Sequence, residues 1–337
     1  MKILIVKLSS LGDVVHSLPL ISRLRQNINV SKLDWLTGPK GIELLSLARG
    51  IDNVYLLNWK NIVKLRQEKY DYVIDVQGLF KTGLIAKLIN PKTVVGFKGT
   101  REFADLFYDI KVDAGKLFDT KKHIIDLNLE LLSVISSSPN LPNGKEFFSL
   151  PKPDKTNPTS STSSRKKVLI LPSTTWASKL WGLNYWFELI CYLEKSFDVS
   201  IAASKHDEEY LLPLIEKFKS QNVQFRNYIG KTNIQDLICL IQNMNLVIGL
   251  DSGGLHLASA IGYDFGNPQV IGIYGSTSVS RNGPYGFIQN CINLSELECI
   301  ACRKKKCPLF HHKCMVELVP DLVIQKVSSL LNKTYAK

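Results

Sequence analysis

The alternation of short apolar runs with helical patterns constrains the fold of this chain more than any other feature. Runs rich in β-branched and aliphatic residues occupy 2–8, 32–36, 54–57 and 72–76, and the segments after them have apolar residues at three- and four-residue spacings. Runs of this kind are typical of strands that are buried on both faces of a parallel sheet. The alternation therefore predicts βαβ units and an α/β fold.

The pattern stops at residues 151–167, PKPDKTNPTSSTSSRKK, and then starts again. This stretch holds three prolines and a Ser/Thr run, so we expect a linker there. Further strands are predicted at 168–171, 199–203, 246–250 and 270–274, followed by a helix near 320–331. We predict two Rossmann-like domains, residues 1–150 and 168–318, facing across a cleft, with residues 319–337 as a C-terminal helix and tail. Ligands of such sheets bind at the carboxyl ends of the strands.

Length, composition and charge exclude several classes of protein. The chain has 337 residues, of which 45% are hydrophobic, as in a packed globular protein. No apolar run reaches the roughly 20 residues that span a bilayer, and the N-terminus is not that of a signal peptide, so we expect a cytoplasmic protein. The net charge of +12 is spread evenly over the two halves. It fits an anionic membrane surface, a phosphorylated substrate or nucleic acid.

Two classes of protein, nucleic-acid-binding modules and dinucleotide-binding dehydrogenases, find little support in the motifs. The sequence lacks the alternation of aromatic and basic residues of an RNA-binding sheet and any common DNA-binding motif, so we expect no nucleic-acid partner. It also lacks the G-x-G-x-x-G fingerprint of a dinucleotide-binding dehydrogenase and the P-loop spacing.

The first predicted strand leads into the loop Lys7–Asp13, which is small, polar and followed by a helix. Its backbone amides are placed to hold an anion. Asp13 has two interpretations, a general base at the mouth of a cleft and a residue that caps the helix. The sequence leaves both open. In the same domain, Gln77, Lys81 and Arg101 lie in polar loops and are either cleft residues or solvated surface groups.

Three loops of the second domain share one chemistry, since each follows a predicted strand and is rich in small or hydroxylated residues. They are STTWASKLW at 173–181, DSGGLH at 251–256 and YGST at 274–277. Hydroxyls, backbone amides and a lysine suit phosphate oxygens, and a Gly-rich turn that opens a helix presents free amides. The alternative is a set of ordinary strand–turn–helix corners. The convergence of the three loops favours one phosphate-rich ligand.

Four of the seven cysteines form a C-x2-C-x4-C-x6-C cluster, Cys299, Cys302, Cys307 and Cys314. In a cytoplasmic chain, a structural zinc or iron–sulfur site is more plausible than disulfides. Free thiols in a small structural knob are the alternative. We expect the cluster to lie away from the loops that follow the strands, and we therefore predict a structural role for it.

Five segments in order resemble the ADP-heptose-dependent heptosyltransferases of glycosyltransferase family 9: MKILIVKLSSLGDVVHSLP, YDYVIDVQGLFKTG, GTREFADLFY, TTWASKLW and DSGGLHLASA. The resemblance implies a GT-B fold, with an acceptor-binding first domain and an ADP-heptose-binding second domain. It implies inverting transfer of a heptose from ADP-L-glycero-D-manno-heptose to the Kdo residue of Kdo-lipid A, in lipopolysaccharide inner-core synthesis. A family 9 transferase of different acceptor or sugar specificity is the alternative.

The resemblance also implies roles for individual residues. Asp13 would be the general base, and Lys179 would stabilise the leaving diphosphate. The donor-binding residues would be Thr174, Thr175, Asp207, Lys231, Thr232, Asp251, Ser252, Gly253, Gly254, Leu255 and His256, with Asp207 standing where a Glu is expected. The acceptor-binding residues would be Lys7, Ser9, Ser10, Gly12, Gln77, Lys81 and Arg101.

The resemblance implies no cofactor and no catalytic metal, which leaves the cysteine cluster as a candidate structural metal site only. It places the enzyme, expected to be a monomer, on the anionic cytoplasmic face of the inner membrane of a Gram-negative bacterium.

Overall fold

The computed structural model describes residues 1–115, 121–135, 146–153 and 165–332. The chain divides into two units, Met1–Lys152 and Pro153–Lys337. Residues 154–164 of the predicted linker and residues 333–337 of the predicted tail lie outside the described ranges. None of the described helices is both long and apolar enough to cross a lipid bilayer.

Unit 1 contains a six-stranded sheet in the order β3-β2-β1-β4-β5-β6, and every neighbouring pair is parallel. Leu4 and Val6 of the central strand β1 belong to one core cluster, while their neighbours Ile3 and Ile5 are also fully buried. Because successive side chains of a strand point to opposite faces, both faces of the sheet are covered. The strands are β1 Lys2–Val6, β2 Lys32–Thr37, β3 Asn53–Leu56, β4 Tyr72–Asp75, β5 Thr93–Phe97 and β6 Ile110–Val112.

The helices of unit 1 connect these strands. Pro19 stands at the first position of its helix, where a missing N–H costs nothing, and so it separates α1 from α2. Ile62 and Leu65 of α4 and Ile85 of α5 pack into the core cluster on one face of the sheet. The helices are α1 Leu11–Val15, α2 Pro19–Asn27, α3 Pro39–Leu47, α4 Trp59–Gln67, α5 Phe80–Leu88 and α6 Ile124–Glu130, with short 3-10 turns η1 Ala104–Phe107 and η2 Leu131–Val134.

Unit 2 contains a five-stranded parallel sheet in the order β11-β10-β7-β8-β9. Its central strands are almost wholly apolar and buried, as expected for a sheet that is covered on both faces. The strands are β7 Lys167–Leu171, β8 Asp198–Ile201, β9 Arg226–Asn227, β10 Leu246–Leu250 and β11 Gln269–Ile273.

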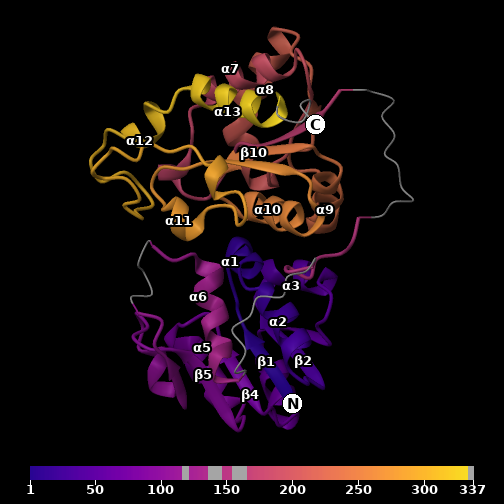
Figure 1. Ribbon diagram of the computed structural model, residues 1–337, viewed down its shortest axis with the longest axis vertical. Coiled ribbons are helices and arrows are strands. Elements are labelled where there is room, and N and C mark those ends of the chain that lie inside the picture. Colours follow the sequence, from indigo (N-terminus) through magenta and orange to yellow (C-terminus); the bar gives the residue numbers. More distant parts are fainter. Residues whose placement is uncertain (116–120, 136–145, 154–164, 333–337) are drawn as a thin grey trace. The chain divides into compact units, whose positions relative to one another are not determined.

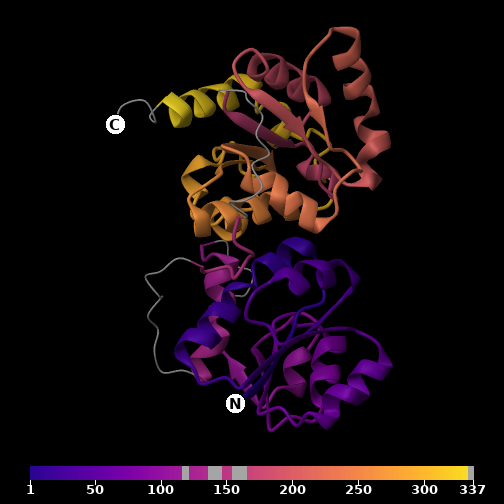
Figure 2. The ribbon, with the colours of Figure 1, turned by 90° about the vertical axis from the view of Figure 1, so that its right-hand side faces the viewer.

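Helices flank this second sheet on both sides. Figure 1 shows α7, α8 and α13 on one side of β10 and α9, α10 and α11 on the other, and Figure 2 gives a perpendicular view. Trp181 and Trp186 are fully buried in the core on the first side and meet edge to face. The helices are α7 Leu183–Leu193, α8 Glu208–Ser220, α9 Ile234–Gln242, α10 Gly253–Phe265, α11 Val279–Asn282, α12 Lys313–Val316 and α13 Pro320–Asn332, with 3-10 turns η3 Ala177–Lys179, η4 Lys205–Asp207 and η5 Ile288–Asn290.

Each strand expected from the sequence is present, and three short or interrupted strands were missed: β5, β6 and β9. Gly96 interrupts the apolar run of β5. A side chain at Gly96 would collide with the ring of Tyr108, because the position of a Cβ there lies 2.2 Å from the ring. A glycine inside a strand often marks such a close approach.

The two parallel sheets place the loops that follow their strands at one edge of each unit. In unit 1, the loops after the adjacent strands β1, β4 and β5 carry the predicted acceptor residues. In unit 2, the loops after all five strands carry hydroxyls or charged groups. Each unit therefore has one polar edge, as a parallel sheet requires.

Replacing Ile248 by Ala should lower the free energy of unfolding of unit 2 by about 2–5 kcal/mol, because the side chain is fully buried in β10 and its loss leaves a cavity. Urea unfolding followed by circular dichroism measures this difference. Leu212→Ala on α8 is the control, since Leu212 is 52% exposed and its loss should cost less than about 0.5 kcal/mol. Equal losses in the two variants would contradict the described core.

Candidate active site

Asp251 is the centre of the polar edge of unit 2. It follows the buried strand β10 and precedes α10, whose first turn is capped by the Ser252 side chain accepting from the Leu255 N–H at 3.5 Å. Asp251 itself is only 5% exposed. A carboxylate this deeply buried must find charged or hydrogen-bonding partners, because desolvation otherwise disfavours its ionised form.

Three side chains supply those partners, one from the segment after β7, one from α10 and one from the loop after β11. Lys179 Nζ lies 2.8 Å from Oδ2 of Asp251, and His256 Nε2 lies 2.9 Å from Oδ1. The Thr277 hydroxyl donates to Oδ2 at 2.6 Å. The loops after β7, β10 and β11 thus converge on one carboxylate.

The electrostatics of this cluster favour a permanently ionised Asp251. Burial by itself would raise the pKa of Asp251. The hydrogen bond with His256 and the charge of Lys179 outweigh burial, so the pKa is held well below its usual range. The Asp251 carboxylate is therefore a fixed negative charge, and it is paired with the ammonium of Lys179.

The loop that carries Lys179 is held by further contacts. The Thr174 hydroxyl donates to the backbone oxygen of Asp251 at 3.0 Å, and Lys179 Nζ stands 4.5 Å from the centroid of the Trp176 ring. A lysine above an indole ring gains a cation–π interaction. Thr175 is exposed on the same loop. The Lys179 ammonium is therefore fixed in place although part of its side chain is open to solvent.

The first turn of α10 begins with Gly253 and Gly254. The first N–H groups of a helix have no partner within the helix, and the helix dipole adds partial positive charge there. Since glycines carry no side chain, a phosphate can approach these amides closely. The combination of these amides with Lys179 is suited to a diphosphate.

Three predicted donor residues lie in neighbouring loops of the same edge. Asp207 accepts hydrogen bonds from the Ser173 hydroxyl at 2.9 Å and from the Ser204 hydroxyl at 2.7 Å, which ties the loop after β8 to the loop after β7. Lys231 is exposed, and its Nζ donates to the backbone oxygen of Asn227 at 3.1 Å. Thr232 follows it at the start of the turn into α9.

The sequence interpretation missed Glu208 at this place. Glu208 begins α8, next to Asp207, and a Cβ on Gly230 would lie 2.0 Å from its Oε1. The Glu208 carboxylate therefore packs against the turn that carries Lys231 and Thr232. The family resemblance implies a glutamate near Asp207, and Glu208 is the next residue of the chain.

In unit 1, Asp13 is the third residue of α1. One oxygen of its carboxylate accepts from the Ser10 N–H at 2.7 Å and from the Ser10 hydroxyl at 2.9 Å. This contact confirms the capping interpretation of Asp13, while its role as a base stays a prediction. The other oxygen, Oδ1, makes no hydrogen bond to the described residues.

Gln77 and Asp75 shape the surroundings of this loop. Gln77 Oε1 accepts from the N–H groups of Leu8 and Ser9 at 3.1 and 3.3 Å. Asp75 in turn accepts from the Gln77 N–H at 2.9 Å and from the Tyr108 hydroxyl at 2.7 Å. Gln77 therefore braces the loop that leads to Asp13, a contact that the sequence did not suggest.

The cations predicted to meet the acceptor differ in their accessibility. Lys7 is only 8% exposed, and burial lowers its pKa despite the nearby charges of Asp13 and Asp75. Lys81, at the start of α5, and Arg101, after β5, are exposed. Lys7 therefore stands behind the loop, whereas Lys81 and Arg101 lie on the surface of the polar edge. Ser9 and Ser10 are exposed and Gly12 is buried.

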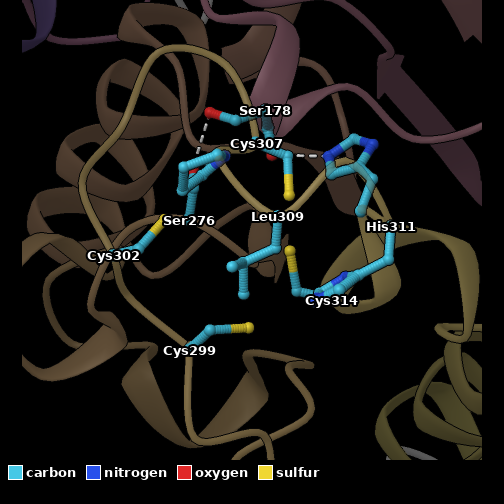
Figure 3. Close-up of a pocket in the computed structure, with 10 residues that line it drawn as sticks. Ser178, Ser276, Cys299, Cys302, Cys307, Leu309, His311 and Cys314 are labelled. Atoms are coloured by element: carbon cyan, nitrogen blue, oxygen red, sulfur yellow. Dashed lines mark hydrogen bonds between the residues drawn. The ribbon is translucent and has the colours of Figure 1, made fainter.

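The four clustered cysteines line one small cavity together with Ser178 and Ser276, and Figure 3 shows their side chains around Leu309. All four are free thiols. The backbone around them binds the loops described above: the Arg303 N–H donates to the Ser276 oxygen at 2.7 Å, and the Ser178 hydroxyl donates to the Lys304 oxygen at 2.5 Å. The expectation that the cluster lies away from these loops is therefore wrong.

The candidate metal site at the cysteines gains no support from the structure. Within residues 1–115, 121–135, 146–153 and 165–332, no three His, Cys, Asp or Glu side chains are arranged to hold a metal ion. Burial, followed by the neighbouring thiols, raises the pKa of Cys314 to about 11, which favours its neutral form. The segment 299–314, called the cysteine knob below, is best described as a packed brace with free thiols.

Comparisons with known proteins agree with this fold and site. Residues 59–313 match the sequence model of glycosyltransferase family 9 (heptosyltransferase). Lipopolysaccharide heptosyltransferase 1 of Escherichia coli K12 is 27% identical over 98% of this chain and 100% of its own length. Lipooligosaccharide heptosyltransferase 2 of Campylobacter jejuni is 27% identical over 83% of this chain and 82% of its own length.

Among solved structures, E. coli heptosyltransferase WaaC with ADP superposes with a TM-score of 0.71 at 22% identity, covering 98% of this chain and 99% of that one. The two parallel-sheet units thus have the GT-B fold of heptosyltransferases, as expected from the sequence. Because the family match covers most of the chain, the protein belongs to glycosyltransferase family 9, the heptosyltransferase family.

Replacing Asp251 by Asn should lower the free energy of unfolding of unit 2 by about 3 kcal/mol, because Lys179 loses its buried counter-charge. Since the folded pKa of Asp251 is depressed, its contribution is complete above the unfolded pKa of about 4 and is lost as the pH falls through the folded pKa. Urea titrations should therefore show a constant difference between wild type and variant from pH 7 to pH 5.

The matched control for this experiment is Lys313→Gln. It removes one partner of an exposed ion pair with Glu317 in the same unit, and such pairs contribute about 0–1 kcal/mol. A difference between wild type and the Asp251 variant that already vanishes at pH 5 would contradict the depressed pKa.

Proposed function

We propose that the protein is a heptosyltransferase I, which transfers a heptose from ADP-L-glycero-D-manno-heptose to the Kdo residue of Kdo-lipid A. The observation that carries this proposal is the ion pair of Lys179 with Asp251, which lies two residues before the first turn of α10, in a chain of the heptosyltransferase family. A lysine ammonium next to free helix amides is an arrangement that binds and stabilises a diphosphate.

In this proposal, unit 2 binds the donor. The amides of Gly253 and Gly254 and the ammonium of Lys179 receive the diphosphate, with the hydroxyls of Thr174 and Thr175 beside them. Asp251 and His256 hold Lys179 in position and face the donor sugar. The loop with Lys231 and Thr232 receives the adenine, and Asp207 or its neighbour Glu208 receives the ribose.

The chemical step in this proposal begins at Asp13. Its free oxygen, Oδ1, takes the proton of an acceptor hydroxyl while that oxygen attacks the anomeric carbon of the heptose. The bond from that carbon to the diphosphate breaks, and ADP leaves with the negative charge. Inversion at the anomeric carbon follows from attack on the side opposite the leaving group. Positive charge from Lys179 and the helix dipole offsets the charge of ADP, so the proposed step uses no metal.

The acceptor in this proposal is an anionic glycolipid. Lys81 and Arg101 would contact its carboxylates or phosphates, while Lys7 acts from behind the loop by its charge. Gln77 fixes the backbone at Leu8 and Ser9 and so keeps Asp13 in place for proton transfer. The preference of the exposed cations for an anionic acceptor agrees with the even basic charge of the chain.

The second candidate function is heptosyltransferase II. It is supported because the Campylobacter jejuni heptosyltransferase 2 and the E. coli heptosyltransferase 1 are each 27% identical to this chain. Purified protein should be incubated with ADP-heptose and either Kdo-lipid A or heptosyl-Kdo-lipid A, with the products followed by mass spectrometry. We expect one added heptose on Kdo-lipid A and little on the heptosylated acceptor. The reverse preference would assign heptosyltransferase II, and transfer to neither acceptor would overturn both assignments.

Asp13→Asn should lower kcat by about 10²–10⁴-fold, because the amide cannot take a proton although it still accepts hydrogen bonds from Ser10. Binding of ADP, measured by calorimetry, should stay unchanged. The control is Ser10→Ala, which removes the hydroxyl contact but leaves the carboxylate. Asp13→Asn with wild-type turnover, or a loss in Ser10→Ala as large as in Asp13→Asn, would contradict the assignment of the base.

A further inference from the structure

Unit 1 carries a set of exposed apolar side chains that the proposed site does not use. Trp59 and Val63 on α4, Phe80 and Leu84 on α5, and Phe103 and Leu106 at η1 are between 39% and 72% exposed. We call these six residues the apolar face. Among the described residues of unit 1, apart from Met1, the large apolar side chains that are at least 36% exposed lie on these elements or at the end of the strand leading into α4.

The elements that carry the apolar face are neighbours in the fold. Helix α5 packs against α4 on one side and against η1 on the other, and the rings of Phe80 and Phe107 meet edge to face with centroids 5.0 Å apart. Phe80 and Leu84, like Trp59 and Val63, are spaced by four residues and so share one side of their helix. That side points away from the sheet, because Ile62 and Ile85 fill the core below.

The same helices are strongly basic. Together α4 and α5 carry Lys60, Lys64, Arg66, Lys81 and Lys87 and no acidic residue. Lys87 is paired with Asp109 at 2.6 Å. Lys60, Arg66 and Lys81 are exposed and have no acidic partner within 4.0 Å among the described residues.

The acidic groups near the apolar face are occupied locally. The Glu102 carboxylate accepts the Phe80 N–H at 3.3 Å, and the Asp105 carboxylate accepts the Gly99 N–H at 3.1 Å. They hold the loop that presents Phe103 and Leu106 against the start of α5. Both carboxylates keep their negative charge, so the positive charge of this surface lies on α4 and α5 and not at η1.

We propose that the apolar face docks unit 1 on the surface of an anionic lipid bilayer. Aromatic and aliphatic side chains that enter the boundary between headgroups and acyl chains, with Lys and Arg beside them, are the features that bind interfacial helices to anionic lipid. A protein partner fits less well, because protein–protein interfaces are depleted in lysine. The proposal assigns the membrane contact that the family resemblance implies to a defined set of residues. It rests on the proposed function only because the proposed acceptor is a lipid that lies in such a bilayer.

Trp59 gives a direct probe of this docking. It is 69% exposed, whereas Trp35, Trp181 and Trp186 are fully buried and Trp176 is half-buried in unit 2. Mixing the full chain with phosphatidylcholine–phosphatidylglycerol vesicles should shift the tryptophan emission to the blue. Phosphatidylcholine vesicles alone should give a much weaker shift. Trp59→Phe should remove the blue shift while the protein still sediments with the mixed vesicles.

Phe103→Ser combined with Leu106→Ser tests the apolar contribution. We expect at least a tenfold loss in the vesicle partition coefficient, because two exposed side chains lose their transfer into the interface. Both side chains are exposed, so folding should be preserved, which circular dichroism checks. The matched control is Leu212→Ser on α8, a leucine that is 52% exposed and whose helix also carries Glu208, Glu209 and Glu216.

Lys64→Gln combined with Arg66→Gln tests the electrostatic contribution. Each charge near an anionic surface is worth a factor of about five in binding, so the double variant should bind roughly 25-fold more weakly. Added salt should weaken the binding of the wild-type protein to the vesicles. It should also reduce the difference in partition coefficient between the wild type and the variant.

Several outcomes would overturn the proposal. If the wild-type protein does not bind mixed vesicles, it has no such surface. If the wild-type protein forms dimers and the Phe103/Leu106 variant does not, the apolar face binds a second copy of the chain. Binding that is lost instead in Phe310→Ser, whose side chain is 94% exposed on the cysteine knob, would place the docking surface on unit 2. Since vesicle binding is measured without donor or acceptor, its failure leaves the proposed transfer reaction standing. Conversely, transfer to neither acceptor would leave the docking surface standing.

Discussion

The buried carboxylate of Asp251 is the constraint on which the polar edge of unit 2 depends. Moving a carboxylate out of water is costly, and the structure offsets that cost with a lysine, a histidine and a threonine hydroxyl. Each partner comes from a different position in the chain, so satisfying one charge fixes the loops after β7, β10 and β11 relative to one another. The stabilisation of a leaving diphosphate that we propose for this site would benefit from this, because pre-positioned charges need no reorganisation during a reaction.

The cysteine knob extends the same constraint outward. Its backbone binds Ser178, the residue before Lys179, and Ser276, the residue before Thr277. The hydroxyls of these two serines also bond to each other at 2.9 Å. The knob therefore supports both loops that meet on Asp251, and its thiols line the cavity behind them. This position explains how a segment without reacting groups can matter for the geometry of the site.

The sequence was sufficient for the α/β class, for the strands with unbroken apolar runs and for the loops that follow them, because local patterns determine these features. It was insufficient where the decisive contact is distant in the chain. Lys179 and Asp251 are far apart in sequence, so no spacing reveals that they form an ion pair, and the bond from Gln77 to the Leu8 N–H is equally invisible. Strand β5 was missed because its glycine weakens the pattern, and only the ring of Tyr108 above it explains why a glycine stands there.

Asp13 caps α1 and is also the residue that we propose as the general base. A capping contact and a role as general base are not exclusive, because the contact with Ser10 uses only one carboxylate oxygen. The cap holds the side chain in one orientation and leaves Oδ1 open to an acceptor hydroxyl. Restricting the rotation of the base is an advantage in proton transfer, since the reacting atoms must meet within hydrogen-bond distance. An interpretation that treats capping as evidence against catalysis would therefore discard the feature that makes Asp13 suitable for it.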